Sequence, residues 1–436
     1  MTPPARETLA ERLRDALQEP PGDGDQPLTT VLRDQHPADV AAALRELDTP
    51  EAAAVFDQLD DAGAAEVLDE LDAELTRYLV DHTPTGRVAA LLDRLPADDA
   101  AEVVAEAPAG QAEPLLAALS AQAPEDAAAV RGLLAYPERT AGRLMTDKYA
   151  VVPPHATAAQ VLQYLRANAH VLETVGVVYV VDEGGRLLGY CPIRQVLTAG
   201  EWQPAGAIMR TDSVMVAPET DQEEVARRIS RYDLAAVPVV DASGRLLGIV
   251  TVDDAIDVLV EEFSEDFLRL AGTDAEAMER RTPVQVARLR LPWLLGTMGI
   301  ELGSGLVIAH FDQVLREVIL LASFMPVISA ISGNVGLQAA AIVVRGLDTG
   351  HVALPRWGRQ VSRELATTLL MALVCGAVLG GIGAVWSQHP PFGLVVGVAL
   401  ACAMLTAAFM GSVIPMVSKR LGFDPATTAG PFETAF

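Results

Sequence analysis

The sequence predicts a multidomain chain in which an all-α helical solenoid and an α/β repeat precede an α-helical transmembrane bundle. Residues 281–436 contain long apolar runs and carry 7 acidic and 10 basic residues, a net charge of +3. Residues 1–280 carry 51 acidic and 22 basic residues, a net charge of −29. Within that acidic part, residues 1–135 show recurring amphipathic helices and residues 140–263 an internal repeat. This division indicates one part in lipid and another in water that attracts cations.

Four apolar runs are long enough to cross a bilayer, which requires about 20 helical residues. Basic residues precede the first run, lie between the second and third, and follow the fourth, whereas the other two loops carry only Arg316. The positive-inside rule therefore predicts a multi-pass protein whose N-terminal domains are cytoplasmic. The runs are Leu291–Ala309, Val318–Val344, Leu365–Trp386 and Gly393–Val417.

Polar residues interrupt the second run. Asn334 and Gln338 are four residues apart and share a helix face, while Pro326 and the glycines at 333 and 336 are expected to loosen the helix. Two interpretations stay open, an ion path or polar packing between helices. Glu301 is the only acidic residue inside a predicted span, which makes it a candidate for contact with ions, unless it is neutral or faces water near the outer rim.

Composition excludes several function classes. No basic stripe is present to neutralise phosphates, so nucleic acid is not an expected partner. Cys191, Cys375 and Cys402 are too far apart for metal-ligand spacing or a disulfide framework. No histidine accompanies a plausible nucleophile, so the chain is not expected to be an enzyme.

The first 135 residues are poor in β-formers and repeat short amphipathic units. Proline or aspartate stands at the start of each unit, and apolar residues follow at helical spacing. Such units are typical of stacked helices in a small solenoid. They read HPADVAAALREL, TPEAAAVFDQL, DAGAAEVLDEL and LPADDAAEVVAEA.

The internal repeat contains GRLLG twice, at 185–189 and 244–248, each predicting a tight turn between two apolar strands. Both copies resemble cystathionine-β-synthase (CBS) domains. CBS pairs often bind adenine nucleotides such as ATP, with a ribose contact from the acid of a Ser/Thr-x-x-Asp motif. The second copy matches this motif with Thr251 and Asp254, which makes Asp254 a candidate nucleotide ligand. The first copy has Gln195 at the position of the acid.

The order of these parts resembles the magnesium transporter E (MgtE) family over essentially the whole chain. The motifs that carry the resemblance are HPADVAAALREL, YPERTAGRLMT, the CBS repeats, RLPWLL, SGNVGLQAAAIVVRGLDTG and DPATTAGP. The resemblance implies a homodimeric, Mg²⁺-selective channel that imports Mg²⁺ across the plasma (inner) membrane. It also implies five parts: a helical N-domain (1–137), a CBS-domain pair (138–203 and 204–263), a linking plug helix (264–283) and a transmembrane domain (284–436).

The resemblance further implies that Mg²⁺ is both substrate and regulatory ligand, and that Mg²⁺ bound between N-domain, CBS pair and plug closes the pore. Mg²⁺ prefers oxygen ligands and needs only one or two carboxylates at each site. The pore is expected at the dimer axis, lined by the second and fifth spans, with Asn334 and Gln338 on its wall and Glu301 as a further candidate. The matching regulatory acids are Glu66, Asp98, Glu102, Glu223, Asp233, Asp254, Asp257 and Asp266, with Glu262 and Glu265 nearby.

Asp424-Pro425 predicts the start of a fifth helix, with aspartate as N-cap. The acid of the family's pore lies four residues after a threonine that matches Thr434, beyond Phe436. We therefore expect four complete spans and the start of a fifth, from a sequence truncated there. Two alternatives stay open: a non-conducting membrane protein that senses Mg²⁺ or nucleotide, and a divalent-cation carrier coupled to another ion through Glu301.

Overall fold

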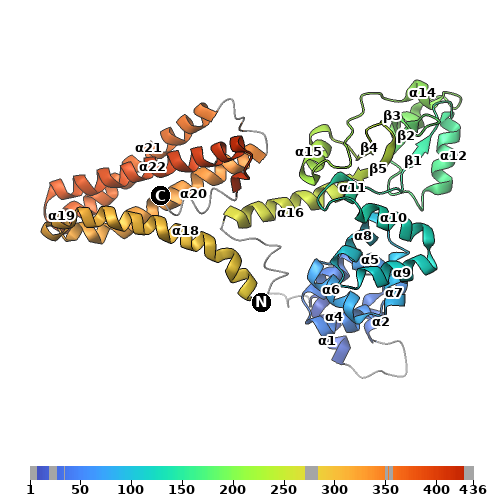
Figure 1. The fold of residues 1–436 in the computed structure, drawn as a ribbon, viewed down its shortest axis with the longest axis horizontal. Helices are drawn as coiled ribbons and strands as arrows, with labels where there is room; N and C mark the ends of the chain where they lie inside the picture. Colours follow the sequence, from blue (N-terminus) through green and yellow to red (C-terminus); the bar gives the residue numbers. More distant parts are fainter. Residues whose placement is uncertain are drawn as a thin grey trace, which may run out of the picture. The chain divides into compact units, whose positions relative to one another are not determined.

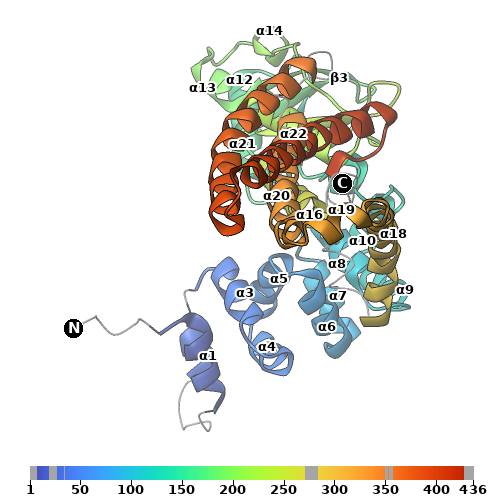
Figure 2. The same cartoon turned by 90° about the vertical axis from the view of Figure 1, so that its left-hand side faces the viewer.

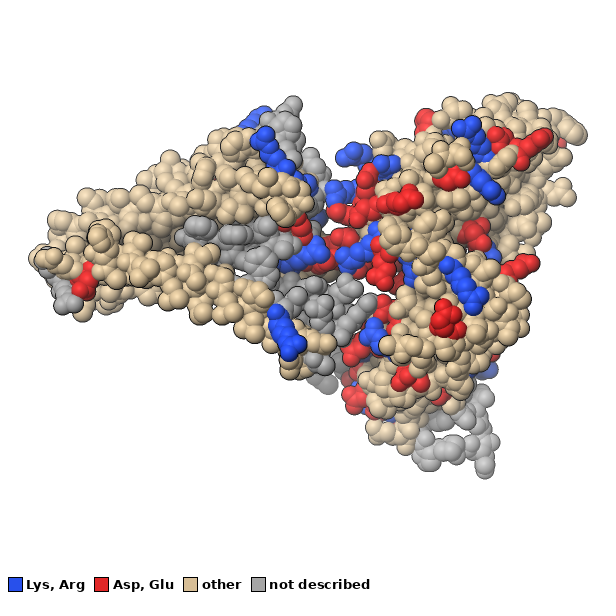
Figure 3. Space-filling view, in the orientation of Figure 1, with Lys and Arg blue, Asp and Glu red and all other residues tan. Residues whose placement is uncertain are grey.

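The computed structural model describes residues 7–18, 27–33, 35–270, 283–348, 352 and 357–426. The chain divides into two compact units, Met1–Val260 and Glu261–Phe436, which are considered separately (Figure 1). In the space-filling view, acidic side chains gather on the first unit, whereas the helices of the second unit are largely uncharged along their length (Figure 3).

The first unit begins with a stack of short helices, as the amphipathic units predict. Aspartates cap several of them: Asp60 accepts a hydrogen bond from the Gly63 amide at 2.9 Å, and Asp72 accepts one from the Leu75 amide at 3.0 Å. The helices are α1 (Leu9–Gln18), α2 (Pro27–Leu32), α3 (Pro37–Arg45), α4 (Thr49–Phe56), α5 (Asp61–Asp69), α6 (Ala73–His82), α7 (Thr85–Leu92), α8 (Ala97–Glu106), α9 (Ala112–Gln122) and α10 (Pro124–Leu134).

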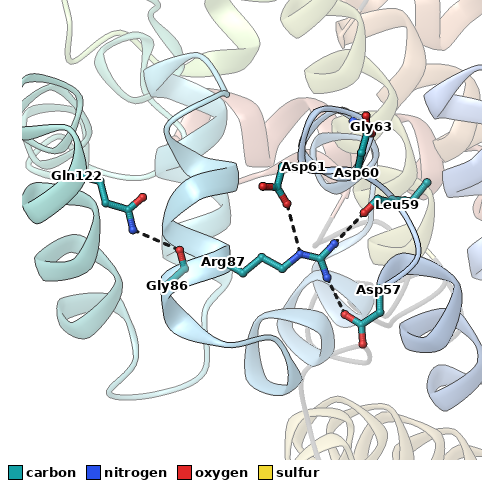
Figure 4. A network of polar contacts seen from close by, with 8 residues as sticks. All are labelled: Asp57, Leu59, Asp60, Asp61, Gly63, Gly86, Arg87 and Gln122. Atoms are coloured by element: carbon teal, nitrogen blue, oxygen red, sulfur yellow. Dashed lines mark hydrogen bonds and ion pairs between the residues drawn. The ribbon is translucent and has the colours of Figure 1, made fainter.

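Arg87 on α7 ties neighbouring helices of this stack together (Figure 4). Its guanidinium donates to Asp57 Oδ1 at 2.8 Å and to the Leu59 carbonyl at 2.9 Å, both in the connection between α4 and α5. The same group lies 5.8 Å from the centre of the Phe56 ring. A single arginine thus satisfies a loop carbonyl and fixes the helices whose apolar faces form the core.

Two small sheets follow, one in each copy of the repeat. The first has the order β1-β2-β3, with β1 parallel and β3 antiparallel to β2, and the second is the antiparallel pair β4-β5. Gly185 and Gly244 adopt positive φ angles of 78° and 82° in the two predicted turns. The strands are β1 (Ala150–Val152), β2 (Val177–Val181), β3 (Leu187–Pro192), β4 (Ala236–Val240) and β5 (Leu246–Thr251), and the helices α11 (Ala141–Leu144), α12 (Ala158–Asn168), α13 (Ile193–Thr198), α14 (Ala205–Ile208) and α15 (Gln222–Tyr232).

The two copies exchange their first segments. The segment with α11 packs on the second copy, where the Gly142 amide donates to the Pro218 carbonyl and the Thr146 amide to the Ile249 carbonyl, both at 2.8 Å. The segment with α14 packs on the first copy, where the Arg210 amide donates to the Tyr190 carbonyl at 2.8 Å. The two copies of the α/β repeat are therefore interlocked. Each compact half contains the first segment of the other copy, so the halves do not coincide with a simple division of the sequence at residue 203.

A single helix, α16 (Val252–Leu270), follows β5 without a break. It continues across the expected boundary between the second CBS domain and the plug helix at residue 263. The remainder of the expected plug, residues 271–282, lies outside the described residues. The acids at the start and at the end of α16 therefore belong to one continuous helix.

Within its described residues, the second unit contains four helices long and apolar enough to cross a membrane, which confirms the four predicted spans. Figures 1 and 2 both show α20, α21 and α22 side by side. Their core includes Phe324, Ala372, Leu400 and Met404. The helices are α18 (Pro283–His310), α20 (Leu320–Asp348), α21 (Trp357–Ser387) and α22 (Pro390–Leu421), with the short α19 (Asp312–Glu317) between the first two.

The expectation of a loosened second span is wrong, because α20 is continuous through Pro326 and through the glycines at 333 and 336. Pro326 stands inside α20, beyond its first turn, so the Ala322 carbonyl receives no amide hydrogen bond from that position although the helix continues. The Ser332 hydroxyl donates to the Ile328 carbonyl at 2.8 Å, a local bond that a membrane helix accommodates.

Glycines allow α21 and α22 to approach closely. A Cβ atom on Gly376 would come within 2.9 Å of the Gly397 carbonyl oxygen, and one on Gly380 within 2.7 Å of the Gly393 oxygen. Gly376 and Gly380 therefore form a contact face of α21. The pair at 299 and 303 on α18 has no described atom within 4 Å of such a Cβ, so it makes no such contact within the described chain.

The end of α22 and the start of a further helix are both capped. Gly422 ends α22 in a left-handed conformation with φ 83°. Asp424 Oδ1 then accepts a hydrogen bond from the Ala426 amide at 2.8 Å, which confirms the predicted N-cap. Residues 427–436 lie outside the described residues.

Candidate functional site

A group of carboxylates lies where the helical stack meets the second copy of the α/β repeat. Asp98 comes from the first turn of α8, and Asp254 from the first turn of α16. Arg143, just after the stack, donates to the Ala101 carbonyl of α8 at 2.9 Å and so fixes α8 against the segment that carries α11. One apolar core continues from the stack into β4 and β5, so the two acids are held on a common support.

Burial and mutual repulsion characterise these acids. Desolvation, followed by the charge of Asp254, raises the pKa of Asp98 to about 8. Desolvation raises the pKa of Asp254 as well, against hydrogen bonds to that carboxylate from the Thr251 hydroxyl at 2.6 Å and amide at 3.2 Å. Asp98 Oδ1 is buried without a hydrogen-bond partner among the described residues. Two carboxylates whose surroundings disfavour their negative charge would be stabilised by a bound cation.

Three further acids belong to this group and were not among the predicted ligands. Desolvation, followed by the charge of Asp98, raises the pKa of Asp99 to about 10. Asp69 and Glu173 lie at the exposed edge of the group. Desolvation, followed by the charge of Glu102, raises the pKa of Asp69 to about 7, and desolvation, followed by the charge of Asp254, raises the pKa of Glu173. Asp69 and Asp99 lie close in sequence to predicted ligands, whereas Glu173 stands in a loop that no motif marks.

The other predicted ligands are dispersed. Glu66 and Glu102 are exposed on α5 and α8, and Asp257 is exposed on α16. Glu223 pairs with Arg227, and Asp233 adopts a left-handed conformation with φ 51° at the end of α15. In the second unit, Glu265 is buried and pairs with Arg269, Glu262 is half-buried, and the side chain of Asp266 lies outside the described residues.

Among the described residues, no three His, Cys, Asp or Glu side chains converge closely enough to hold one metal ion. The acids come from different elements, and the charge of one raises the pKa of another. Such an arrangement is compatible with Mg²⁺, which keeps several waters and takes only one or two carboxylates from a protein.

The polar residues of the second span lie on one face. Asn334 and Gln338 are both exposed, whereas Val335 and Ala339 beside them are buried against the other helices of the bundle. The polar face of α20 is therefore not used for packing within the described chain. Glu301 is also exposed, on α18.

A pocket of about 330 Å³ lies between the two copies of the repeat. Its lining includes Arg194 and Arg210, and Arg210 forms an ion pair with Asp212 at 2.6 Å and lies 5.6 Å from the centre of the Tyr190 ring. The Tyr179 hydroxyl and the Ser213 hydroxyl, both in the lining, are buried without partners among the described residues. Asp254, the predicted nucleotide ligand, is not in the lining of this pocket.

Three family models match the chain in order. The MgtE intracellular N domain matches residues 35–139, the CBS domain matches residues 141–201 and 205–261, and the MgtE divalent cation transporter model matches residues 325–436.

Curated relatives are named "Magnesium transporter MgtE". The protein from Thermus thermophilus is 37% identical over 310 residues, which cover 71% of this chain and 69% of the relative. That from Bacillus subtilis is 34% identical over 316 residues, which cover 72% of this chain and 70% of the relative.

Two solved structures match the part of the chain outside the membrane spans. One is the cytosolic domain of the Mg²⁺ channel MgtE in complex with ATP, with 38% identity and a TM-score of 0.53, covering 57% of this chain and 99% of that structure. The other is the soluble part of a magnesium transporter, with 27% identity and a TM-score of 0.51, covering 58% and 96%.

Proposed function

Because this chain belongs to the MgtE family of magnesium transporters, a non-enzymatic class, we propose that it forms a Mg²⁺ channel in the plasma membrane that intracellular Mg²⁺ closes. The observation that carries the gating part is the juxtaposition of Asp98 and Asp254. Desolvation and the charge of neighbouring acids make it costly to ionise each carboxyl group.

Closure follows from differential affinity. Without Mg²⁺, the compact arrangement makes it unfavourable to ionise the acids of α8 and α16 together, so their loss of protons favours separation of the helical stack from the α/β pair. Mg²⁺ bound between them removes the repulsion and binds more tightly to the compact arrangement, so it shifts the population toward that arrangement. Glu66, Glu102, Glu223, Asp233 and Asp257 are proposed as further ligands in the same role.

The long helix α16 is the proposed connection between sensor and pore. It carries Asp253, Asp254 and Asp257 at its start and Glu262 and Glu265 near its end. A helix of 19 residues without a break transmits a displacement of one end to the other. Ordering of its first turns by Mg²⁺ is therefore proposed to hold its last turns over the cytoplasmic mouth.

The proposed conduit lies between two copies of the chain. The polar face of α20, with Asn334 and Gln338, is exposed from its own bundle, and polar groups at membrane depth require protein or a water-filled path. A homodimer with two such faces at its axis would supply that path, and hydrated Mg²⁺ could exchange waters for their amide oxygens.

We further propose that the pocket between the CBS copies binds an adenine nucleotide. The similar cytosolic domain that was solved with ATP supports this, as do two arginines and two unpartnered hydroxyls in the lining. Arg194 and Arg210 would contact the phosphates. Gln195, at the position of the usual ribose acid, is not in the lining of this pocket.

Proteoliposomes of the full-length protein test the function directly. We expect Mg²⁺ uptake that falls as the Mg²⁺ concentration on the cytoplasmic face rises into the millimolar range. Asp254→Asn with Asp257→Asn should conduct and require at least threefold more Mg²⁺ to close, whereas Glu125→Gln, an exposed acid on α10, should behave as wild type. Absence of Mg²⁺ uptake would favour a non-conducting sensor, and uptake indifferent to internal Mg²⁺ would contradict the gating proposal.

A further inference from the structure

An arginine links the last turn of α16 to the segment that follows α22. Arg269 Nη1 lies 2.7 Å from Asp424 Oδ2, and Arg269 also forms an ion pair with Glu265, one turn earlier on α16. These three residues all belong to the second unit. One guanidinium thus matches two carboxylates that come from distant parts of the sequence.

The acceptor at Asp424 is fixed by the local fold. Its Oδ1 caps the following helix through the Ala426 amide, which leaves Oδ2 to face Arg269. Ala426 in turn is buried against Ala340 and Val344 of α20. The ion pair therefore connects α16 to a structured position against a membrane span.

Burial gives these ion pairs more weight than an ordinary surface contact. The side chain of Glu265 is 7% exposed, that of Arg269 30% and that of Asp424 34%. Exposed pairs contribute little because water screens them, whereas removal of one partner from a partly buried pair leaves a charge without compensation.

A second contact lies six residues before Arg269 on the same helix. The guanidinium of Arg345, in the last turn of α20, lies 5.1 Å from the centre of the Phe263 ring on α16. Both contacts join α16 to the ends of the spans through a cation that belongs to the protein.

We infer that Arg269 is an internal cation that latches the end of α16 to the cytoplasmic end of the bundle, where it neutralises Glu265 and Asp424 without a divalent ion. The inference rests on the proposed function in one respect, that the latched helix is the closed one. Part of the free energy that favours the closed state is then independent of Mg²⁺, and regulatory Mg²⁺ has to supply only the rest of that free energy. In this arrangement Glu265 forms an ion pair with Arg269 and is not a ligand of Mg²⁺.

Hydrogen exchange of the full-length protein in nanodiscs, with Mg²⁺ removed by EDTA, tests the latch independently of conduction. Arg269→Gln should accelerate amide exchange of residues 262–270 at least about fivefold. The matched control is Arg228→Gln, which breaks an i,i+4 pair with Glu224 on α15 and should leave residues 262–270 unchanged. Unchanged exchange in Arg269→Gln would overturn the inference.

Asp424→Asn provides a second variant that preserves the fold, because asparagine also caps helices while it removes the charge. It should accelerate exchange of residues 262–270 as well. In the double variant, Arg269→Gln with Asp424→Asn, the fold-acceleration should be smaller than the product of the fold-accelerations in the two single variants. Multiplicative effects would show that the two residues act separately and would refute the latch.

Flux measurements then connect the latch to gating. In proteoliposomes, Arg269→Gln should raise the internal Mg²⁺ concentration for half-closure at least threefold, with Arg228→Gln unchanged. A change in exchange without any Mg²⁺ flux in wild type would contradict the proposed function and leave the latch standing. A normal closing concentration in a conducting Arg269→Gln channel would refute its role in closure.

Discussion

At the scale of single residues, carboxylates whose surroundings disfavour their charge are the proposed sensors of Mg²⁺. Asp98 and Asp254 were predicted as ligands by position in the family motifs, and their desolvation gives a physical reason why a cation would be held there. Glu173 and Arg269 were not predicted, because each acquires its role from contacts with residues far along the chain. No local pattern in a sequence encodes such contacts.

The raised pKa values make Mg²⁺ binding and stability depend on pH. In the folded state the pKa of Asp98 is about 8, against an ordinary value of 3.8, so the Mg²⁺-free protein binds more protons folded than unfolded between these values. Its stability should therefore fall as pH rises from about 4 to about 8. Thermal unfolding without Mg²⁺ should show a lower Tm at pH 8.5 than at pH 6.

Millimolar Mg²⁺ should largely remove that dependence, because the ion replaces the protons that the carboxylates lose. Calorimetry in two buffers of different ionisation enthalpy should therefore detect proton release on binding. A Tm that rises with pH in the absence of Mg²⁺ would contradict the assigned pKa shifts.

At the scale of elements, the sequence predicted the four spans, the solenoid helices, the GRLLG turns and the cap at Asp424, because periodicity and turn chemistry are local properties. It did not predict the exchange of segments between the CBS copies or the continuity of α16. Both depend on packing between elements that are distant in sequence. The last glycine of each GRLLG turn lies where an exchanged segment packs. Gly248 contacts Met145, and Gly189 contacts Arg210.

The exchange predicts an effect of Gly248→Ala. A Cβ there would lie 2.8 Å from Met145 Cγ, so the exchanged segment has to shift, at a cost of about 1–3 kcal/mol in the free energy of unfolding. Gly132→Ala on α10 is the control, because nothing described lies within 4 Å of its Cβ and alanine favours a helix by about 1 kcal/mol. Denaturant unfolding of residues 1–260 measures both, and equal stabilities of the two variants would contradict the packing described.

At the scale of the whole molecule, an acidic body and an apolar bundle share one helix. The first unit concentrates negative charge at contacts between its parts, and the second has a polar helix face that no described residue of its bundle covers. The proposed divalent cation and the proposed second copy would each compensate one of these features. The proposed link between sensing and conduction rests on that compensation.

Titration of the soluble part, residues 1–260, with MgCl₂ tests the central claim most directly, since similar soluble parts were crystallised by themselves. Scattering and calorimetry should show binding heat and a smaller radius of gyration over the same millimolar range, with NaCl at matched ionic strength producing neither. A radius that stays constant, with no heat of binding, would contradict the account.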